Sequence, residues 1–475
     1  MIAGLKQNPE QWRDLALVLL AGLVMAACWS LIPGALAGTV YELELIQLAP
    51  KVWLYLRIDA LGVFFAVIIS SLWLLALIYS QGYLGPDRRN RYYLVLMLSL
   101  GLALGVAWAG NLLTMLVFYE LLSIMAYLLV VHEETPAAKA AATKYIVYIL
   151  VGGSLILVGV VLVFHLVGSL AFSVTPLLHD GIERGYLVAV FVFLIAGFGV
   201  KAALVPLHGW VPDAHPAAPA PFSALLSGVL VATGAFGIIR VVLQVFGVEL
   251  LARLGFMHWV SLLATVGVLA AGLAAMRQDN LKRRLAYSTI SQMGYITLAV
   301  SLLGREAIIG ALVHIGNHAF MKTTLFFCAG LLMRRAGIQR VSEMGGVARS
   351  LPLTMGAFAV AALGLIGVPP LAGFVSKWLL GTGALEAGWP VYMAVFLGGS
   401  LLTAFYLLPI LYVAYFKEPP MVAGAEERRV TEAGAWRMLV PTLIAAACTV
   451  GLGVAATAPG MPLELARAAV APFWP

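Results

Sequence analysis

The chain is a succession of apolar runs of about twenty residues, separated by short polar or turn-rich segments. A helix needs about 20 apolar residues to cross a bilayer, whereas strands of a membrane barrel are about 10 residues long and alternate in polarity. Only 11% of the residues are charged, against about 25% in soluble domains. The sequence therefore predicts an all-α polytopic membrane protein. We expect about thirteen transmembrane helices, near residues 15–33, 59–80, 92–108, 111–131, 143–167, 187–207, 221–246, 257–276, 284–303, 307–332, 352–386, 391–416 and 436–457.

The basic residues are divided unequally between the two sets of loops. The loops that follow the second, fourth, eighth, tenth and twelfth helices carry 17 Lys and Arg residues, and the segments on the other side carry 7. Loops rich in Lys and Arg stay in the cytoplasm. This bias predicts a cytoplasmic N-terminus and an external C-terminus. The net charge of +7 then reports membrane topology, and no nucleic-acid partner is expected.

Two of the predicted helices are interrupted. Pro206 follows Lys201 in the sixth helix, and the segment GVPP, residues 367–370, precedes Lys377 in the eleventh. Paired breaks beside charged residues are typical of internal repeats around ion sites, and an odd repeat of five helices inverts the second copy. The partial alternation of YELELIQLAPKVWLYLRID indicates a short external hairpin. The expected organisation is residues 1–91 for the N-terminal helices and hairpin, 92–246 and 257–416 for two inverted repeats, each with a broken helix, and 436–475 for a C-terminal helix.

Several ionisable residues lie within the apolar runs. A charge at the membrane centre costs about 2.5–3.5 kcal/mol even on the mildest scale, so such residues usually have a function. His314, His318 and Lys322 recur every four residues and share one helix face. Histidine is suited to carrying protons at physiological pH, which favours a relay over a structural cluster. A zinc site is disfavoured because no third ligand is apparent. The residues predicted to translocate protons are Glu120, Lys201, His314, His318, Lys322 and Lys377.

Two further groups have competing interpretations. Lys377 has no carboxylate close by in sequence, and burial favours the neutral form of a lone amine, so it suits proton loading; the alternative is that it snorkels to the interface beside Trp378. His208, Asp213 and His215 lie in the proline-rich turn of the sixth helix. They are candidates for an access path, although Asp213 also suits the capping of a turn.

Redox and nucleotide chemistry are not expected of this chain. The three cysteines stand singly in apolar runs, without the spacing of an iron–sulfur or zinc site. The glycines and lysine of GVPPLAGFVSK lack the order of a phosphate-binding loop. No cofactor and no metal are therefore predicted, and electron transfer would belong to partner subunits.

Five stretches carry a resemblance to a known family: FYELLSIMAY, GFGVKAALVPLHGWVPDAHPAAPAPFSALLSG, DNLKRRLAYSTISQMGYI, HIGNHAFMKTTLFF and GVPPLAGFVSKWLL. They resemble the antiporter-like subunits shared by respiratory complex I, membrane-bound hydrogenases and Mrp-type cation/proton antiporters. The resemblance implies a fold of fourteen helices with two inverted five-helix repeats, each containing a broken helix. It also implies a place in the inner or plasma membrane, among other membrane subunits of a larger complex.

The resemblance also implies roles for individual residues. The glutamate that matches Glu120 pairs with the lysine that matches Lys201, and protons pass along a central polar axis to the residue that matches Lys377. The similarity is greatest to the proton-conducting membrane transporters of the Mrp type and to their complex I relatives.

The chain departs from the family pattern in two places. One N-terminal helix is missing, and Ala232 stands where the family often has a lysine. Three hypotheses therefore remain open. The chain is a proton-translocating subunit of a complex-I-like or hydrogenase-type assembly such as an NADH:quinone oxidoreductase, a subunit of an Mrp-type sodium/proton antiporter, or a structural subunit that no longer pumps.

Overall fold

The computed structural model describes residues 9–50, 52–418 and 431–474, and almost all of its regular structure is helical. The first part comprises α1 (Pro9–Ser30), α2 (Ile32–Leu36), β1 (Tyr41–Ala49), β2 (Val52–Ile58), α3 (Ala60–Tyr83), α4 (Arg89–Ala107), α5 (Leu112–Val130), α6 (Pro136–Val167), α7 (Arg184–Lys201), α8 (Val211–Ala217), α9 (Ala220–Leu225), η1 (Leu226–Leu230), α10 (Val231–Arg240) and η2 (Val241–Phe246). The rest comprises α11 (Val248–Leu254), α12 (Met257–Met276), α13 (Leu281–Ser301), α14 (Arg305–Ala336), η3 (Val341–Glu343), α15 (Val347–Ser350), α16 (Pro352–Ile366), α17 (Ala372–Glu386), α18 (Pro390–Phe416), α19 (Trp436–Val454), α20 (Pro462–Val470) and η4 (Ala471–Phe473).

The all-α membrane fold is confirmed. Within the described part of the chain, ten helical segments are long and apolar enough to span a membrane. Two more, α13 and α14, are long enough, with 21 and 32 residues, but are rich in polar side chains. The halves α16 and α17 form one further interrupted crossing. Together these segments account for the thirteen predicted helices.

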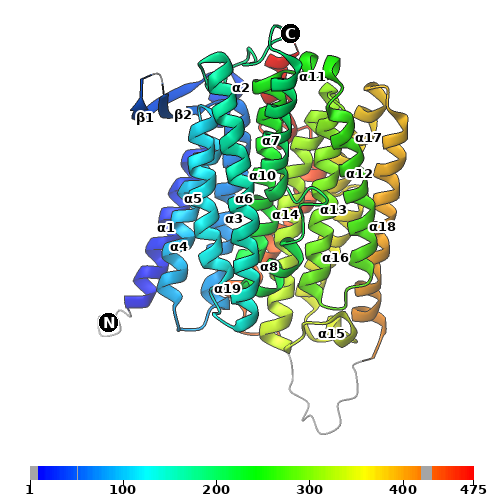
Figure 1. Ribbon diagram of the computed structural model, residues 1–475. Helices are drawn as coiled ribbons and strands as arrows, with labels where there is room; N and C mark the ends of the chain where they lie inside the picture. The colour runs from blue at the N-terminus through cyan, green and yellow to red at the C-terminus, as the bar shows by residue number, and fades with distance from the viewer. Residues whose placement is uncertain (1–8, 51, 419–430, 475) are drawn as a thin grey trace.

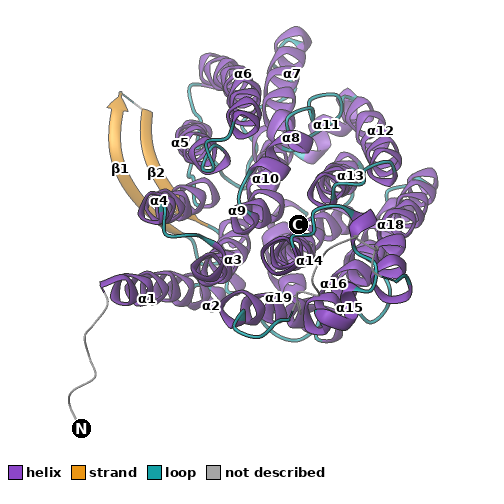
Figure 2. Ribbon diagram, turned by 90° about the horizontal axis from the view of Figure 1, so that it is seen from below, coloured by secondary structure: helices purple, strands orange, loops and turns teal. Residues whose placement is uncertain are grey.

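The helices stand side by side in one bundle (Figure 1). Seen along the bundle axis, α10 and α14 lie at the centre, and α1 lies at the edge (Figure 2). Burial follows this arrangement. The continuous segment from α9 to η2 is 100% buried over its most apolar window, and α1 is only 11% buried. The segment from α9 to η2 is therefore shielded from lipid by the other helices, whereas α1 is not.

Where the sequence indicates a hairpin, β1 and β2 pair antiparallel beside the bundle (Figure 1). Tyr41 lies opposite Ile58, and an ion pair joins Glu42 to Arg57 across the strands. The hairpin meets the bundle where Arg57 donates its backbone N–H to the carbonyl of Trp108. Lys51, one of the cations used to predict topology, lies outside the described residues.

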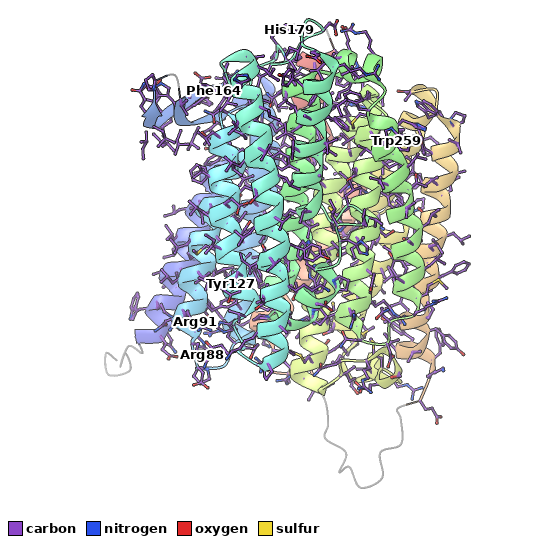
Figure 3. All side chains as sticks on the ribbon, in the orientation of Figure 1. Arg88, Arg91, Tyr127, Phe164, His179 and Trp259 are labelled. Atoms are coloured by element: carbon purple, nitrogen blue, oxygen red, sulfur yellow. The ribbon has the colours of Figure 1, made fainter. Side chains whose placement is uncertain are left out.

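One end of the bundle is rich in arginine, and Arg88 and Arg91 lie there (Figure 3). Both pair with Glu134, at 2.8 and 2.5 Å, and the hydrogen bond from Arg91 lowers the pKa of this carboxyl group. Figure 3 places His179 and Trp259 toward the opposite end of the bundle. Arg428 and Arg429 lie outside the described residues.

Both predicted helix breaks are present, and side chains satisfy the backbone groups that they free. A break inside a membrane leaves carbonyls that must find a donor. After α7, the carbonyl of Val200 accepts a hydrogen bond of 2.9 Å from the indole of Trp210. After α16, the carbonyl of Ile366 accepts one of 3.1 Å from Lys377 Nζ. Each break is therefore a built feature of the fold.

A buried ion pair ties α10 to the start of α3 at the hairpin end. Arg240 donates to both carboxylate oxygens of Asp59, at 2.5 and 2.9 Å, and to Gln244 at 2.8 Å. The Arg240 side chain is only 1% exposed. Asp59 also caps α3 by accepting from the backbone N–H of Gly62. Removing one partner of such a pair leaves an uncompensated buried charge.

We therefore expect Asp59→Ala to cost about 3–5 kcal/mol of stability, which thermal unfolding of the purified protein would detect as a lower midpoint. Asp180→Ala is the matched control, because Asp180 pairs with Arg253 where both side chains are more than half exposed. Exposed pairs contribute only about 0–1 kcal/mol. Equal midpoints for the two variants would contradict the structural role of the buried pair.

Candidate functional site

We refer to residues 92–246 as the first half of the bundle and to residues 257–416 as the second half. In the second half, Lys322 has no exposed surface. It projects from α14 toward α13, and its Nζ donates to the carbonyl of Leu285 at 2.9 Å and to Ser288 Oγ at 2.7 Å. Ser288 Oγ in turn lies 2.9 Å from the hydroxyl of Tyr406 on α18. A buried ammonium is thus held entirely by neutral oxygen atoms, with no carboxylate within 4.0 Å among the described residues.

From Tyr406 a chain of polar side chains leads to His314. The hydroxyl of Tyr406 donates to Thr403 Oγ1 at 3.2 Å, and Gln292 Nε2 lies 3.5 Å from that same atom. Gln292 Oε1 contacts His314 Nε2 at 3.0 Å. The other ring nitrogen of His314 lies 2.8 Å from Ser376 Oγ on α17. Hydrogen-bonding side chains therefore run from Lys322 to the broken helix of the second half.

Lys377 lies beside the end of this chain, next to the ring of Tyr295. Its Nζ donates to Ser400 Oγ at 2.9 Å and lies 4.8 Å from the centre of the Tyr295 ring. That ring stacks on His314, with centroids 5.8 Å apart. Trp378, by contrast, is 61% exposed. The neighbouring side chains therefore differ, with Trp378 exposed and Lys377 part-buried against Ser400 and Tyr295.

His318 and His215 are fully buried beside this network. Neither ring nitrogen of either histidine has a hydrogen-bond partner within the described residues. His318 lies 6.2 Å from His314 between ring centroids and interacts electrostatically with Lys322 and His215. The His215 ring stacks on Phe326 of α14 at 5.0 Å. His215 belongs to α8, so it brings an ionisable group from the first half against the second-half cluster.

In the first half, Lys201 is 1% exposed and contacts α5. Its Nζ donates to Ser123 Oγ at 2.8 Å, contacts the Tyr119 carbonyl at 3.4 Å and lies 3.9 Å from the Tyr119 ring centre. Glu120 also lies on α5, one turn before Ser123. Its Oε1 is buried without a hydrogen-bond partner among the described residues.

The direct ion pair that the resemblance implies between Glu120 and Lys201 is not formed in this structure. The lysine is held by Ser123, although the two charges lie close enough to interact electrostatically. Glu120 packs against Gly153 of α6, where an added Cβ would lie 1.9 Å from Oε1. Gly153 is thus a supporting residue that sequence reasoning missed, because its role depends on a contact between helices.

Ala232 is fully buried and cannot hold a proton. Two residues later, α10 packs directly on the backbone of α7, since a Cβ on Gly234 would lie 2.3 Å from the Ala202 nitrogen. The polar contact between the halves is made nearby by Ser227 of η1, whose hydroxyl lies 2.6 Å from that of Thr289 on α13. π-helical turns are frequent at functional sites, and here one presents Ser227 to the second half.

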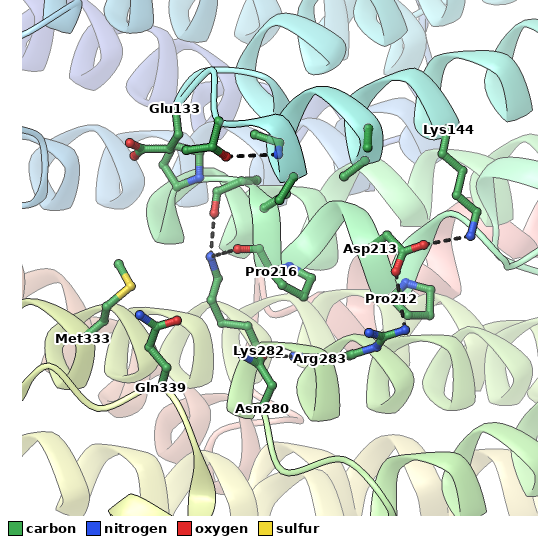
Figure 4. A pocket seen from close by; sticks show the side chains of 18 of the residues that line it. Glu133, Lys144, Pro212, Asp213, Pro216, Asn280, Lys282, Arg283, Met333 and Gln339 are labelled. Atoms are coloured by element: carbon green, nitrogen blue, oxygen red, sulfur yellow. Dashed lines mark hydrogen bonds and ion pairs between the residues drawn. The ribbon is translucent and has the colours of Figure 1, made fainter.

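A cavity of about 800 Å³, which we call the vestibule, opens at the arginine-rich end between the two halves (Figure 4). Asp213 lies at its wall and bridges Lys144 at 2.7 Å and Arg283 at 3.5 Å. Lys282 reaches in from α13 and donates to the carbonyls of Pro216 and Ala218. Asp213 thus cross-links α6, α8 and α13, and the backbone beside His215 forms part of the vestibule wall. The vestibule lining does not include His208.

Several members of the network follow a signal that the sequence carries. Ser400, Thr403 and Tyr406 recur every three residues on α18, which places them on one face of a helix. Ser288, Gln292 and Tyr295 recur at intervals of four and three residues on α13 and likewise share one face. The spacing identifies a polar face, but it does not identify the helix that the face meets.

The comparisons with known proteins agree with this architecture. Residues 109–403 match the family model described as the transmembrane part of NADH:quinone oxidoreductase/Mrp antiporter subunits. The chain is 35% identical to NADH-quinone oxidoreductase subunit N of Desulforudis audaxviator, over 91% of this chain and 90% of that protein. It is 33% identical to hydrogenase-4 component B of Escherichia coli, over 68% of this chain but only 50% of that relative.

Solved structures show the same fold. A chain of the archaeal membrane-bound sulfane sulfur reductase superposes with a TM-score of 0.86 at 27% identity, covering 97% of this chain and 92% of that one. A chain of respiratory complex I from Thermus thermophilus gives a TM-score of 0.82 at 25% identity, covering 96% and 95%. This multi-pass membrane protein therefore belongs to the NADH:quinone oxidoreductase/Mrp antiporter family of antiporter-like subunits.

Proposed function

We propose that this chain translocates protons as one membrane subunit of a larger respiratory or hydrogenase-type complex. The observation that carries the proposal is the run of hydrogen-bonding side chains from Lys322 through Gln292 and His314 to Ser376, next to Lys377. Amine, imidazole and hydroxyl groups in contact can pass protons by successive hydrogen-bond exchange. In this proposal the energy for translocation comes from partner subunits of the complex.

The proposed path begins at the vestibule and joins the two halves without a lysine at position 232. His215, behind the vestibule wall, interacts electrostatically with Lys322 and with Lys282. His215 and His318 would take the place of the lysine that the family often has at position 232. Lys201 and Glu120 would determine the charge of the first half. We also propose that residues 92–246 and 257–416 form two repeats. The arginine-rich end of the bundle then lies on the cytoplasmic side.

The alternative of sodium/proton exchange needs an oxygen-rich cation site. Asp59 is already occupied by Arg240, and Glu120 offers one carboxylate beside a lysine. These observations favour protons as the transported ion. Sodium-dependent acidification of vesicles that contain only this subunit would support exchange.

The alternative of a structural subunit rests on Ala232, and the contact between Ser227 and Thr289 argues against it.

Replacing His215 with phenylalanine should preserve its stacking on Phe326 and remove both ring nitrogens. We expect proton translocation by the reconstituted complex to fall by about tenfold, equivalent to about 1.4 kcal/mol in the barrier. Dye-monitored acidification of liposomes, normalised to turnover, measures this loss. His165→Phe, at an exposed position near the end of α6, is the control. Equal rates for both variants would remove His215 from the path.

A further inference from the structure

Two cavities, which together we call the cleft, lie one after the other along the contact between α3 and α19. The first, of about 330 Å³, is at the arginine-rich end and is lined by Gly82 and Tyr83 of α3, Arg437 of α19, and Arg334 and Arg335 of α14. The second, of about 530 Å³, lies farther into the bundle. Along α3 it extends from Phe64 to Ile78, and along α19 from Ile444 to Leu452. We call them the arginine cavity and the apolar cavity.

The arginine cavity has an excess of positive charge. Arg334 lies over the Tyr83 ring at 4.5 Å, and Arg335 donates to the carbonyls of Thr431 and Ala433. The Arg437 side chain is 58% exposed, and the nearest carboxylate, Asp14, lies 3.9 Å away. Asp14 is itself paired with Arg13 at 2.6 Å. Arg437 thus has only Asp14 as a carboxylate partner, which Arg13 already neutralises, and Arg334 and Arg335 add two further guanidinium groups to the lining, which suits a phosphate group.

The apolar cavity has the chemistry of a hydrocarbon site. Its wall is made almost entirely of aliphatic and aromatic side chains, and the Ser71 hydroxyl already accepts a hydrogen bond of 3.0 Å from the Trp29 indole. The stretch from Phe64 to Ile78 is about 21 Å long at 1.5 Å per residue, enough for much of an acyl chain. Met25 and Trp29 of α1 form part of the cavity wall, and α1 is itself only 11% buried.

We propose that this cleft binds an anionic phospholipid, with its phosphate in the arginine cavity and an acyl chain in the apolar cavity. The order of the two cavities matches the polarity of a lipid in one leaflet, and basic pockets between helices at the membrane surface bind such headgroups. Tyr83 and Arg334 line both the arginine cavity and the vestibule. The headgroup therefore contacts the wall of the vestibule and stabilises it. This inference stands independently of the proposed proton path.

The headgroup half of the proposal is tested by lipid retention on the purified full chain, measured by native mass spectrometry with cardiolipin and phosphatidylcholine as probes. The double variant Arg334→Gln with Arg437→Gln should weaken cardiolipin binding by about thirtyfold, since each basic residue contributes about 1 kcal/mol, and leave phosphatidylcholine unchanged. Arg349→Gln, at an exposed position of the same end, should match the unaltered chain. Unchanged cardiolipin binding in the double variant would overturn the proposal.

The acyl-chain half is tested by filling the apolar cavity. Gly451 lines it, and a Cβ added there meets no atom within 4 Å, so Gly451→Leu should fold and exclude the chain. Gly398→Leu on α18, with equal open space, is the control. We expect about tenfold weaker cardiolipin binding for Gly451→Leu alone, the equivalent of about two buried CH₂ groups. Equal binding by both variants, or full competition by millimolar inorganic phosphate, would point to a free-anion site and overturn the lipid assignment.

Discussion

Replacing Lys377 with methionine is expected to lower proton translocation by at least about tenfold, or about 1.4 kcal/mol in the barrier. Methionine fills a similar volume but holds no proton, so Ser400 would face an inert side chain beside the end of the network. The measurement is the number of protons delivered per turnover of the parent complex in liposomes.

Two further variants separate proton transfer from charge and from folding. Lys377→Arg keeps the positive charge, but arginine is effectively always protonated, so translocation should stay low. Lys417→Met removes a lysine at the exposed end of α18 and should leave translocation unchanged. If Lys377→Arg translocated protons at the normal rate, Lys377 would have only an electrostatic role.

Replacing Gln292 with leucine should cut the network at its middle. Gln292 contacts His314 at 3.0 Å through Oε1 and Thr403 at 3.5 Å through Nε2, and it is fully buried. Leucine has nearly the same size but makes neither contact, so we expect about a tenfold loss of proton translocation, equivalent to about 1.4 kcal/mol in the barrier.

The control is Thr297→Val on the same helix. Thr297 Oγ1 is buried without a partner in the described chain, so its removal should leave the rate unchanged. If both variants reduced translocation equally, the loss would reflect general damage to α13. If neither did, protons would bypass Gln292.

Hydropathy is sufficient to predict most of the fold. The 257–276 helix is predicted at its observed bounds, because a bilayer imposes one length on any apolar span. The break before Lys377 is also predictable, since paired prolines cannot continue a helix. The two π-helical turns around α10 are not predicted from hydropathy. Their contacts are with distant segments: η1 packs against α14 and meets α13 through Ser227, and η2 accepts backbone hydrogen bonds from Leu177 and Leu178.

The candidate site is only partly predictable from sequence. Buried charges are rare in apolar runs, so the lysines and histidines can be selected one by one. Their partners are contacts between helices far apart in sequence, such as Ser288 with Tyr406, 118 residues away. In this structure Ser123 rather than Glu120 makes the hydrogen bond to the Lys201 ammonium, although the two charges interact electrostatically. The spacing of residues along one helix cannot predict which neighbouring side chain reaches a flexible lysine.

The central claim is that the buried amines of both halves act on one path. Its most direct test is the number of protons translocated per turnover in Lys201→Met, Lys377→Met and the double variant. Groups that act as a unit are non-additive. We predict that each single variant loses nearly all translocation and that the double variant is no worse. If each single variant kept about half and only the double variant lost the rest, the halves would conduct separately and the single path would be contradicted.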